Sequence, residues 1–142
     1  FITISILIVR MENIYLPILK SEEPKQNACY EVVRYIQEKG FKTAYANFEN
    51  ANVMTVLSDG EVRVASIDNM GEMNICKWMT STDWYVPNVP YEERTAYIVT
   101  NQGMKDFERM LDKYGEEIQY ETRIGDYYTI YSSNYNYSTM QE

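Results

Sequence analysis

The chain has 142 residues, 45% of them hydrophobic, and this length and composition are those of a single globular domain. It contains no histidine, which excludes Ser-His-Asp and Cys-His catalytic arrangements and removes the commonest metal ligand. Its net charge of −8, without any cluster of lysine and arginine, argues against a nucleic-acid surface and against docking on anionic lipid headgroups.

Residues 1–27 are predicted as an apolar segment followed by a connector. The opening stretch "FITISILIVR" is shorter than the roughly 20 apolar residues that cross a bilayer. It is therefore either a strand or helix of the globular fold or the outer end of a transmembrane helix that begins outside this sequence. The next stretch, "MENIYLPILKSEEPKQN", combines prolines with charges and is typical of a connector.

Helical and strand patterns alternate from Ala28 onward. They predict a helix over 28–39 ended by Gly40, a strand over 41–48, a short helix capped by Asn50 and running to Leu57, a turn over 58–60 and a strand over 61–67. Residues 68–93 fit no single pattern: 73–79 is either a short strand or a helical turn, and 81–94 is a proline-containing loop.

The C-terminal half has clearer patterns. A strand is predicted over 95–100, and a helix over 101–113 carries the apolar stripe of Phe107, Met110 and Leu111 and ends at Gly115. Residues 117–132 predict a closing hairpin around Gly125 that supplies antiparallel edge strands. We therefore predict an α/β fold over 28–133, a single layered domain whose mixed sheet is covered by helices, with a flexible tail over 134–142.

Amides crowd the corner after the first strand, at Tyr45 to Asn52. In open α/β sheets ligands sit beyond the carboxyl ends of strands, where helix N-termini begin. Two interpretations remain open: a ligand site, or a scaffold in which the amides satisfy the local backbone. We expect Asn50 to cap the helix and Asn52 to be structural. The candidates for ligand contact, completed by two aromatic residues of the later loop, are Tyr45, Asn47, Glu49, Asn50, Asn52, Trp84 and Tyr85.

No residue stands out as catalytic. The adjacent glutamate pairs lie in predicted loops or at element ends, where a solvated face is the simpler interpretation, and the chain has no phosphate-binding glycine loop. Cys29 and Cys76 lack CxxC spacing, so we expect neither a metal nor a cofactor. The two thiols either form one disulfide or remain free and buried, and we expect the second. The 14 tyrosines suit both core packing and binding surfaces.

The runs "GFKTAYANFENANVMTVLSDGEVRVASI", "KWMTSTDWY" and "RTAYIVTNQGMKDFERMLDKYG", with "GDYYTIYSSN" after them, carry a resemblance over residues 28–132. They resemble the C-terminal extracytoplasmic region of bacterial membrane glycosyltransferases of the C superfamily, the dolichyl-phosphate-mannose-protein mannosyltransferase-like family. That family has a segment similar to GYA-x-x-W-N-A-N, followed by LS-x-G-x-V and a KW pair. This chain carries Glu49 where the family often has an aromatic residue, which puts a stacking role at that position in doubt.

The resemblance implies that residues 1–10 end the last transmembrane helix and that the following domain faces the extracellular side of the cell membrane. It also implies that catalysis resides in membrane loops of the parent protein. This chain is then an accessory domain whose partners are the membrane portion of the parent and a glycan or peptide acceptor. The alternatives are a free-standing small α/β binding protein and, third, an enzyme that works through carboxylate or tyrosine chemistry.

Overall fold

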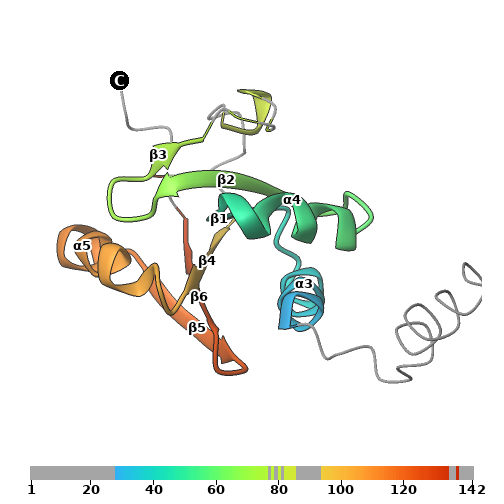
Figure 1. Cartoon of the computed structure of the whole chain (residues 1–142). Coiled ribbons are helices and arrows are strands. Elements are labelled where there is room, and N and C mark those ends of the chain that lie inside the picture. Colours follow the sequence, from blue (N-terminus) through green and yellow to red (C-terminus); the bar gives the residue numbers. More distant parts are fainter. Residues whose placement is uncertain are drawn as a thin grey trace, which may run out of the picture.

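The computed structural model of the chain describes residues 28–76, 78, 80, 82–85, 94–134 and 137. The predictions for residues 1–27, and for most of the loop and the tail, lie outside this described part. Within it, a sheet of six strands carries helices on both faces, so the predicted α/β fold with a mixed sheet is confirmed (Figure 1). No helix of the described ranges has the length and apolar character needed to span a membrane.

The sheet has the strand order β3-β2-β1-β4-β6-β5. Its strands are β1 (Thr43–Asn47), β2 (Arg63–Asn69), β3 (Asn74–Ile75), β4 (Thr95–Thr100), β5 (Gln119–Ile124) and β6 (Tyr128–Ser133). Strand β1 pairs in parallel with β2 and β4, whereas the pairs β2–β3, β4–β6 and β5–β6 are antiparallel. The sheet is therefore parallel at its centre.

The closing hairpin forms as predicted, but the expectation that both of its strands lie at the edge was wrong. Strand β6 is inserted between β4 and β5, and β5 alone forms this edge. The residue pattern explains the order. Five of the six residues of β6 are buried, which suits an interior strand, whereas β5 is exposed or half-buried until its last residue.

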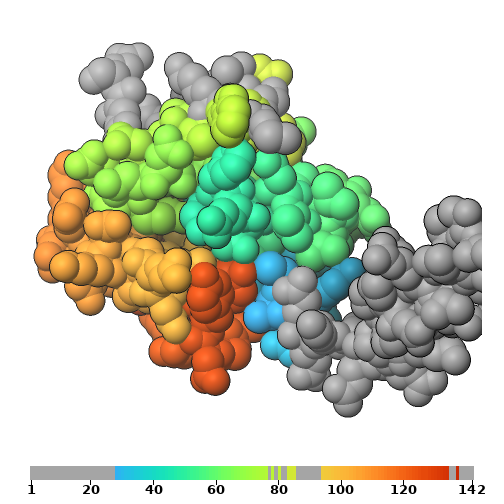
Figure 2. All heavy atoms as spheres, viewed as in Figure 1, coloured from blue at the N-terminus to red at the C-terminus, as the bar shows by residue number. Residues whose placement is uncertain are grey.

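Two helices cover one face of the sheet and a third covers the other (Figure 1). Helices α3 (Ala28–Glu38) and α4 (Phe48–Leu57) pack on the first face, and α5 (Met104–Tyr114) packs on the second. Helix α3 ends where predicted, because Gly40 takes a φ of 76° and allows its N–H to bond the Gln37 carbonyl at 2.9 Å. Helix α4 lies at the surface, as its teal and green atoms show in Figure 2.

Each face has its own apolar core. The core under α3 and α4 includes Val32, Ile36, Met54, Val64 and Ile98, all less than 2% exposed. The core under α5 is built largely from rings and methionines: Tyr45, Tyr97, Phe107, Met73, Met110 and Tyr137. A short 3-10 helix, η2 (Thr82–Tyr85), adds Tyr85 to this second core.

Two predicted helix boundaries are corrected by the structure. Helix α4 begins at Phe48 with Asn47 at the N-cap, so the predicted cap at Asn50 was wrong; the chain turns into the helix directly after β1. Helix α5 begins at Met104 rather than at residue 101, because a turn comes first in which the Gly103 N–H bonds the Thr100 hydroxyl at 3.1 Å.

Tyr137 lies inside the segment predicted as a flexible tail, and its side chain belongs to the core under α5. It is 3% exposed, its hydroxyl donates to Glu117 at 2.8 Å, and its main-chain N–H donates to the Tyr97 hydroxyl at 3.4 Å. The two cysteines, Cys29 and Cys76, are buried and form no disulfide with each other.

Candidate functional site

The neighbouring strands β1 and β4 send the chain in opposite directions. Both run the same way, but β1 continues into α4 on one face of the sheet and β4 continues toward α5 on the other. The two connections diverge at the carboxyl ends of these strands, and in open α/β sheets such a switch point leaves a crevice where ligands bind.

A hollow of about 200 Å³ lies at this switch point. We call it the edge hollow. It is lined by residues from the ends of all three parallel strands and from the start of α5: Asn47, Ile67, Asp68, Met70, Ile98, Thr100, Gln102, Gly103 and Asp106. This volume has room for a single sugar ring but not for an oligosaccharide.

The polar groups of the edge hollow combine hydrogen-bond donors with acceptors. Asn47 and Gln102 carry amides, and Asp68 and Asp106 carry carboxylates. Ionised carboxylates only accept, whereas an amide both donates and accepts. A ligand that offers hydroxyl or amino hydrogens therefore matches this lining. The two carboxylates would repel a phosphate group, even though the N-terminus of α5, which favours anions, is nearby.

A hydrogen-bonded chain fixes the orientation of the Asn47 amide. The Asn50 Nδ2 group donates to Asn47 Oδ1 at 2.6 Å, and the Tyr128 hydroxyl donates to Asn50 Oδ1 at 2.9 Å. The Cys29 sulfur lies 3.2 Å from the same hydroxyl. Asn47 Oδ1 is engaged by Asn50, and no hydrogen bond from Asn47 Nδ2 to the described residues competes with a ligand in the hollow that Asn47 lines.

Tyr128 stays neutral in this chain of contacts. Burial, together with its hydrogen bond to Cys29, raises the pKa of Tyr128 well above the ordinary value for tyrosine. Tyr128 as a residue is 4% exposed. Its hydroxyl group therefore keeps its proton at neutral pH and continues to donate to Asn50. Asn50 is thus a bridge between β6 and the edge hollow, which makes its role structural.

The structure separates the other predicted contact residues. Glu49 is exposed in the first turn of α4, and Asn52 is half-buried in the same helix, without a hydrogen bond from its side chain to the described residues. The expectation that Asn52 holds loop amides is therefore not supported. Of the seven predicted site residues, Asn47 alone lines the edge hollow.

The aromatic candidates lie on the α5 face of the sheet. Tyr45 is 1% exposed and stacks on Tyr97 and Tyr85, with ring centroids 5.8 and 6.4 Å apart. Tyr85 is also buried, and its hydroxyl donates to the carbonyls of Ser66 and Cys76 at 2.7 and 2.8 Å. Trp84 is half-buried against the same core. These rings hold the fold together, and no face of Tyr45 is open to a ligand.

An aromatic pair of one exposed and one half-buried ring was missed among the predicted site residues. Trp78 is 74% exposed and stacks on Phe48, with ring centroids 5.8 Å apart. Phe48 follows Asn47 directly in the chain, so this pair lies beside the corner that begins α4. The signal was present in the sequence as the KW pair of the stretch over 77–85, but it was not carried into the list of contacts.

The remaining lining residues were also missed. The rule that ligands bind beyond the carboxyl ends of strands, which selected Asn47, selects them as well. Asp68 belongs to the end of β2, Thr100 is the last residue of β4, and Gln102 follows that strand. No group of three potential metal ligands is found among the residues that the structure describes. Comparisons of the chain with protein-family models, with curated proteins and with solved structures found no match.

Proposed function

We propose that this chain is a binding domain that holds a hydroxyl-rich ligand, one sugar unit of a glycan, in the edge hollow. The observation that carries the proposal is the position of Asn47 at the switch point, where the Asn50–Tyr128 chain of hydrogen bonds engages its Oδ1 atom and leaves its Nδ2 group to donate to a ligand. Sugar hydroxyls both donate and accept, and the hollow offers the complementary amides and carboxylates. A pyranose ring also has an apolar face, which the exposed Trp78 ring suits.

The domain is proposed to act by positioning its ligand rather than by chemistry of its own. The chain has no histidine to serve as a general base near neutral pH. Asp68 and Asp106 are the carboxylates of the edge hollow, and both are proposed to accept hydrogen bonds from ligand hydroxyl groups, although Asp106 Oδ1 also lies 3.6 Å from the Arg109 guanidinium. The resemblance to extracytoplasmic regions of membrane glycosyltransferases supports a glycan or glycan acceptor as the ligand and the membrane portion of such a protein as the partner.

The binding proposal is tested by titrating the chain with a panel of methyl glycosides and short oligosaccharides, followed by backbone amide NMR shifts. Asn47→Ala and Asp68→Ala should each weaken binding about fivefold, because each removes one hydrogen bond to the ligand. Asp112→Ala is the matched control, since Asp112 is exposed on α5 and lies outside the lining. Its affinity should equal that of the original chain.

Two outcomes would overturn the binding proposal. One is the absence of shifts around the edge hollow with every glycan at millimolar concentrations. The other is unchanged affinity in Asn47→Ala, provided that its melting temperature is unchanged. The membrane-protein context has a separate test in the full reading frame of the gene. Several upstream segments of membrane-spanning length support it, whereas a start codon at or just before Met11 supports the free-standing binding protein.

A further inference from the structure

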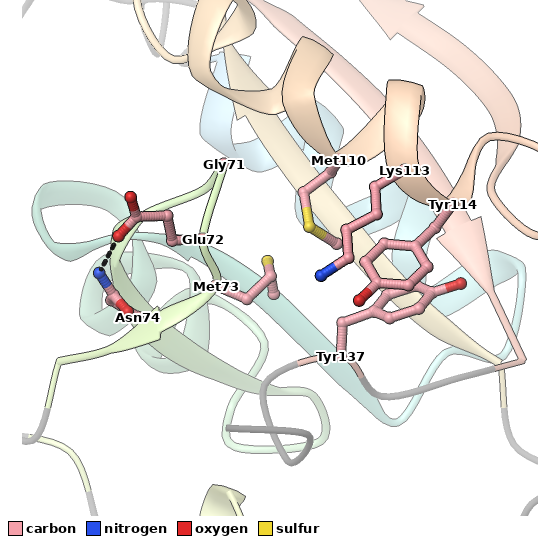
Figure 3. A pocket seen from close by; sticks show the side chains of 8 residues that line it. All are labelled: Gly71, Glu72, Met73, Asn74, Met110, Lys113, Tyr114 and Tyr137. Carbon is pink, nitrogen blue, oxygen red and sulfur yellow. Dashed lines mark hydrogen bonds between the residues drawn. The ribbon is translucent and has the colours of Figure 1, made fainter. Parts of the chain in front are cut away.

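A second hollow lies on the α5 face, between the turn that joins β2 to β3 and the C-terminal half of α5 (Figure 3). We call it the turn hollow. Its volume is about 340 Å³, and it is lined by Gly71, Glu72, Met73, Asn74, Met110, Lys113, Tyr114 and Tyr137. This volume falls in the range of small-molecule sites. The turn hollow shares no lining residue with the edge hollow.

The inner wall of the turn hollow is apolar and aromatic. Met73 and Met110 are 1% and 3% exposed, and their side chains point toward each other across the hollow (Figure 3). Tyr114 and Tyr137 stack with ring centroids 4.4 Å apart and form the adjoining wall. Thioether sulfurs and stacked rings both favour contact with another aromatic ring.

Lys113 is the positively charged residue of this lining. The Lys113 Nζ group lies 4.9 Å from the centroid of the Tyr114 ring and points into the space between Met73 and Tyr137 (Figure 3). Arg34, Arg94 and Arg109 each have a carboxylate within 4 Å, but no ion pair involving Lys113 occurs among the described residues. The ammonium is thus placed to meet an anionic group of a ligand.

The nearest acidic side chain of the lining turns away from the turn hollow. Glu72 accepts a hydrogen bond from the Asn74 amide at 2.8 Å, on the side of the turn away from Lys113 (Figure 3). Across the hollow, the Tyr137 hydroxyl donates to Glu117 at 2.8 Å, which fixes the ring and engages that carboxylate. The lining therefore holds one positive charge, on the exposed Lys113, and one negative charge, on Glu72, whose carboxylate is directed toward Asn74.

Hydrogen bonds and backbone conformation shape the turn that forms one wall of the turn hollow. Asn69 Oδ1 accepts the main-chain N–H groups of Gly71 at 2.8 Å and of Glu72 at 3.3 Å, which closes the turn. Met73 has a φ of 53°, a left-handed conformation that a long side chain rarely adopts, and this backbone sends its side chain inward. A preformed hollow loses little conformational entropy when a ligand binds.

From this lining we infer that the turn hollow binds a small aromatic carboxylate, with the ring between the methionines and the tyrosine pair and the carboxylate on Lys113. Two sources share that chemistry: a free aromatic acid, and the last residue of a peptide that ends in phenylalanine. The inference does not depend on the proposed glycan site, because the two hollows have separate linings and separate reporter signals.

The test uses the chain described here, with 3-phenylpropionate as the first probe and 3-phenylpropanamide as its neutral counterpart. A short peptide ending in phenylalanine, with a free or an amidated C-terminus, is the second pair of probes. Binding is followed by the amide signal of Gly71 and the methyl signals of Met73 and Met110. We expect the free carboxylate of each pair to bind about tenfold more tightly than its amide, as a charge-assisted hydrogen bond predicts.

Lys113→Met keeps the length of the side chain and removes its charge. It should weaken carboxylate binding about tenfold and leave amide binding unchanged. Lys105→Met is the matched control, because Lys105 is exposed on the same helix and lies outside both hollows. The relative affinities of 3-phenylpropionate and the peptide identify the source of the ligand. The inference is overturned if neither carboxylate shifts the reporter signals at millimolar concentration, if the amides bind equally well, or if Lys113→Met binds as tightly as Lys105→Met.

Discussion

Gly71 brings the β2–β3 turn close to the main chain of α5, and replacing it with alanine tests the packing beside the turn hollow. A Cβ atom at this position would lie 2.4 Å from the main-chain oxygen of Asp106 and 3.1 Å from its carbonyl carbon. The backbone of Gly71 does not adopt the left-handed conformation, so its φ angle would tolerate alanine. A side chain is excluded at this position because the main chain of Asp106 is too close. Ordinary contacts of this kind begin near 3.4 Å.

The clash can be relieved only if two main-chain segments separate by about 1 Å, and both are anchored in the core. Met73 on one side and Phe107 on the other are 1% and 0% exposed. Overpacking of this kind costs about 1–3 kcal/mol of unfolding free energy. The smaller entropy of the unfolded alanine chain offsets about 0.4–1 kcal/mol of this. We therefore expect Gly71→Ala to lose about 1–2 kcal/mol of unfolding free energy, or roughly 3–7 °C in melting temperature.

Urea unfolding followed by far-UV circular dichroism measures this loss, and the slope of the transition should not change. Gly103→Ala is the matched control. A Cβ atom there would meet its nearest neighbour, the Thr100 hydroxyl, at 3.4 Å, and the φ of −81° suits alanine. Its stability should stay within about 0.5 kcal/mol of the original. If Gly71→Ala were as stable as Gly103→Ala, the close approach of the turn to α5 would be refuted.

Three further predictions concern buried polar groups. Tyr128→Phe should cost about 1 kcal/mol, because it removes the donor to Asn50, and a double-mutant cycle with Asn50→Ala should show coupling; additive losses would contradict the bridge. Burial raises the pKa of Glu121, but its hydrogen bonds and a neighbouring guanidinium outweigh burial and lower the pKa overall. Its stabilisation is thus present above the ordinary glutamate pKa and is lost as the pH falls through the folded value, so Glu121→Gln should flatten the acid side of the stability curve measured by urea unfolding. Burial raises the pKa of Tyr97, and raises that of Tyr137 to about 12. Their stabilisation is complete below the ordinary tyrosine pKa and is lost above it, so tyrosinate absorbance should show these two groups ionising only as the chain unfolds; ionisation near the ordinary pKa without unfolding would contradict this.

Local sequence patterns predict the helices and the longer strands of this chain, because an amphipathic stripe is a property of neighbouring residues. The stripe of Phe107 and Met110 buries one side of α5, as expected. The two-residue strand β3 and the four-residue helix η2 are too short to leave such a pattern. The insertion of β6 between β4 and β5 depends on pairing between distant segments, which periodicity does not encode.

In the edge hollow, too, local features are predictable from the sequence, whereas the contacts between distant segments are not. Strand β1 is covered on both faces, so its interior residues are all buried and alternation cannot single out an exposed ring. Tyr45 is therefore core, although it lies two residues before Asn47. Exposure returns only where the strand ends, and at that point Asn47 meets the ends of β2 and β4. The end of each strand is predictable, but bringing Asp68 and Gln102 to the side of Asn47 requires the strand order, and that order is set by packing on both faces of the sheet.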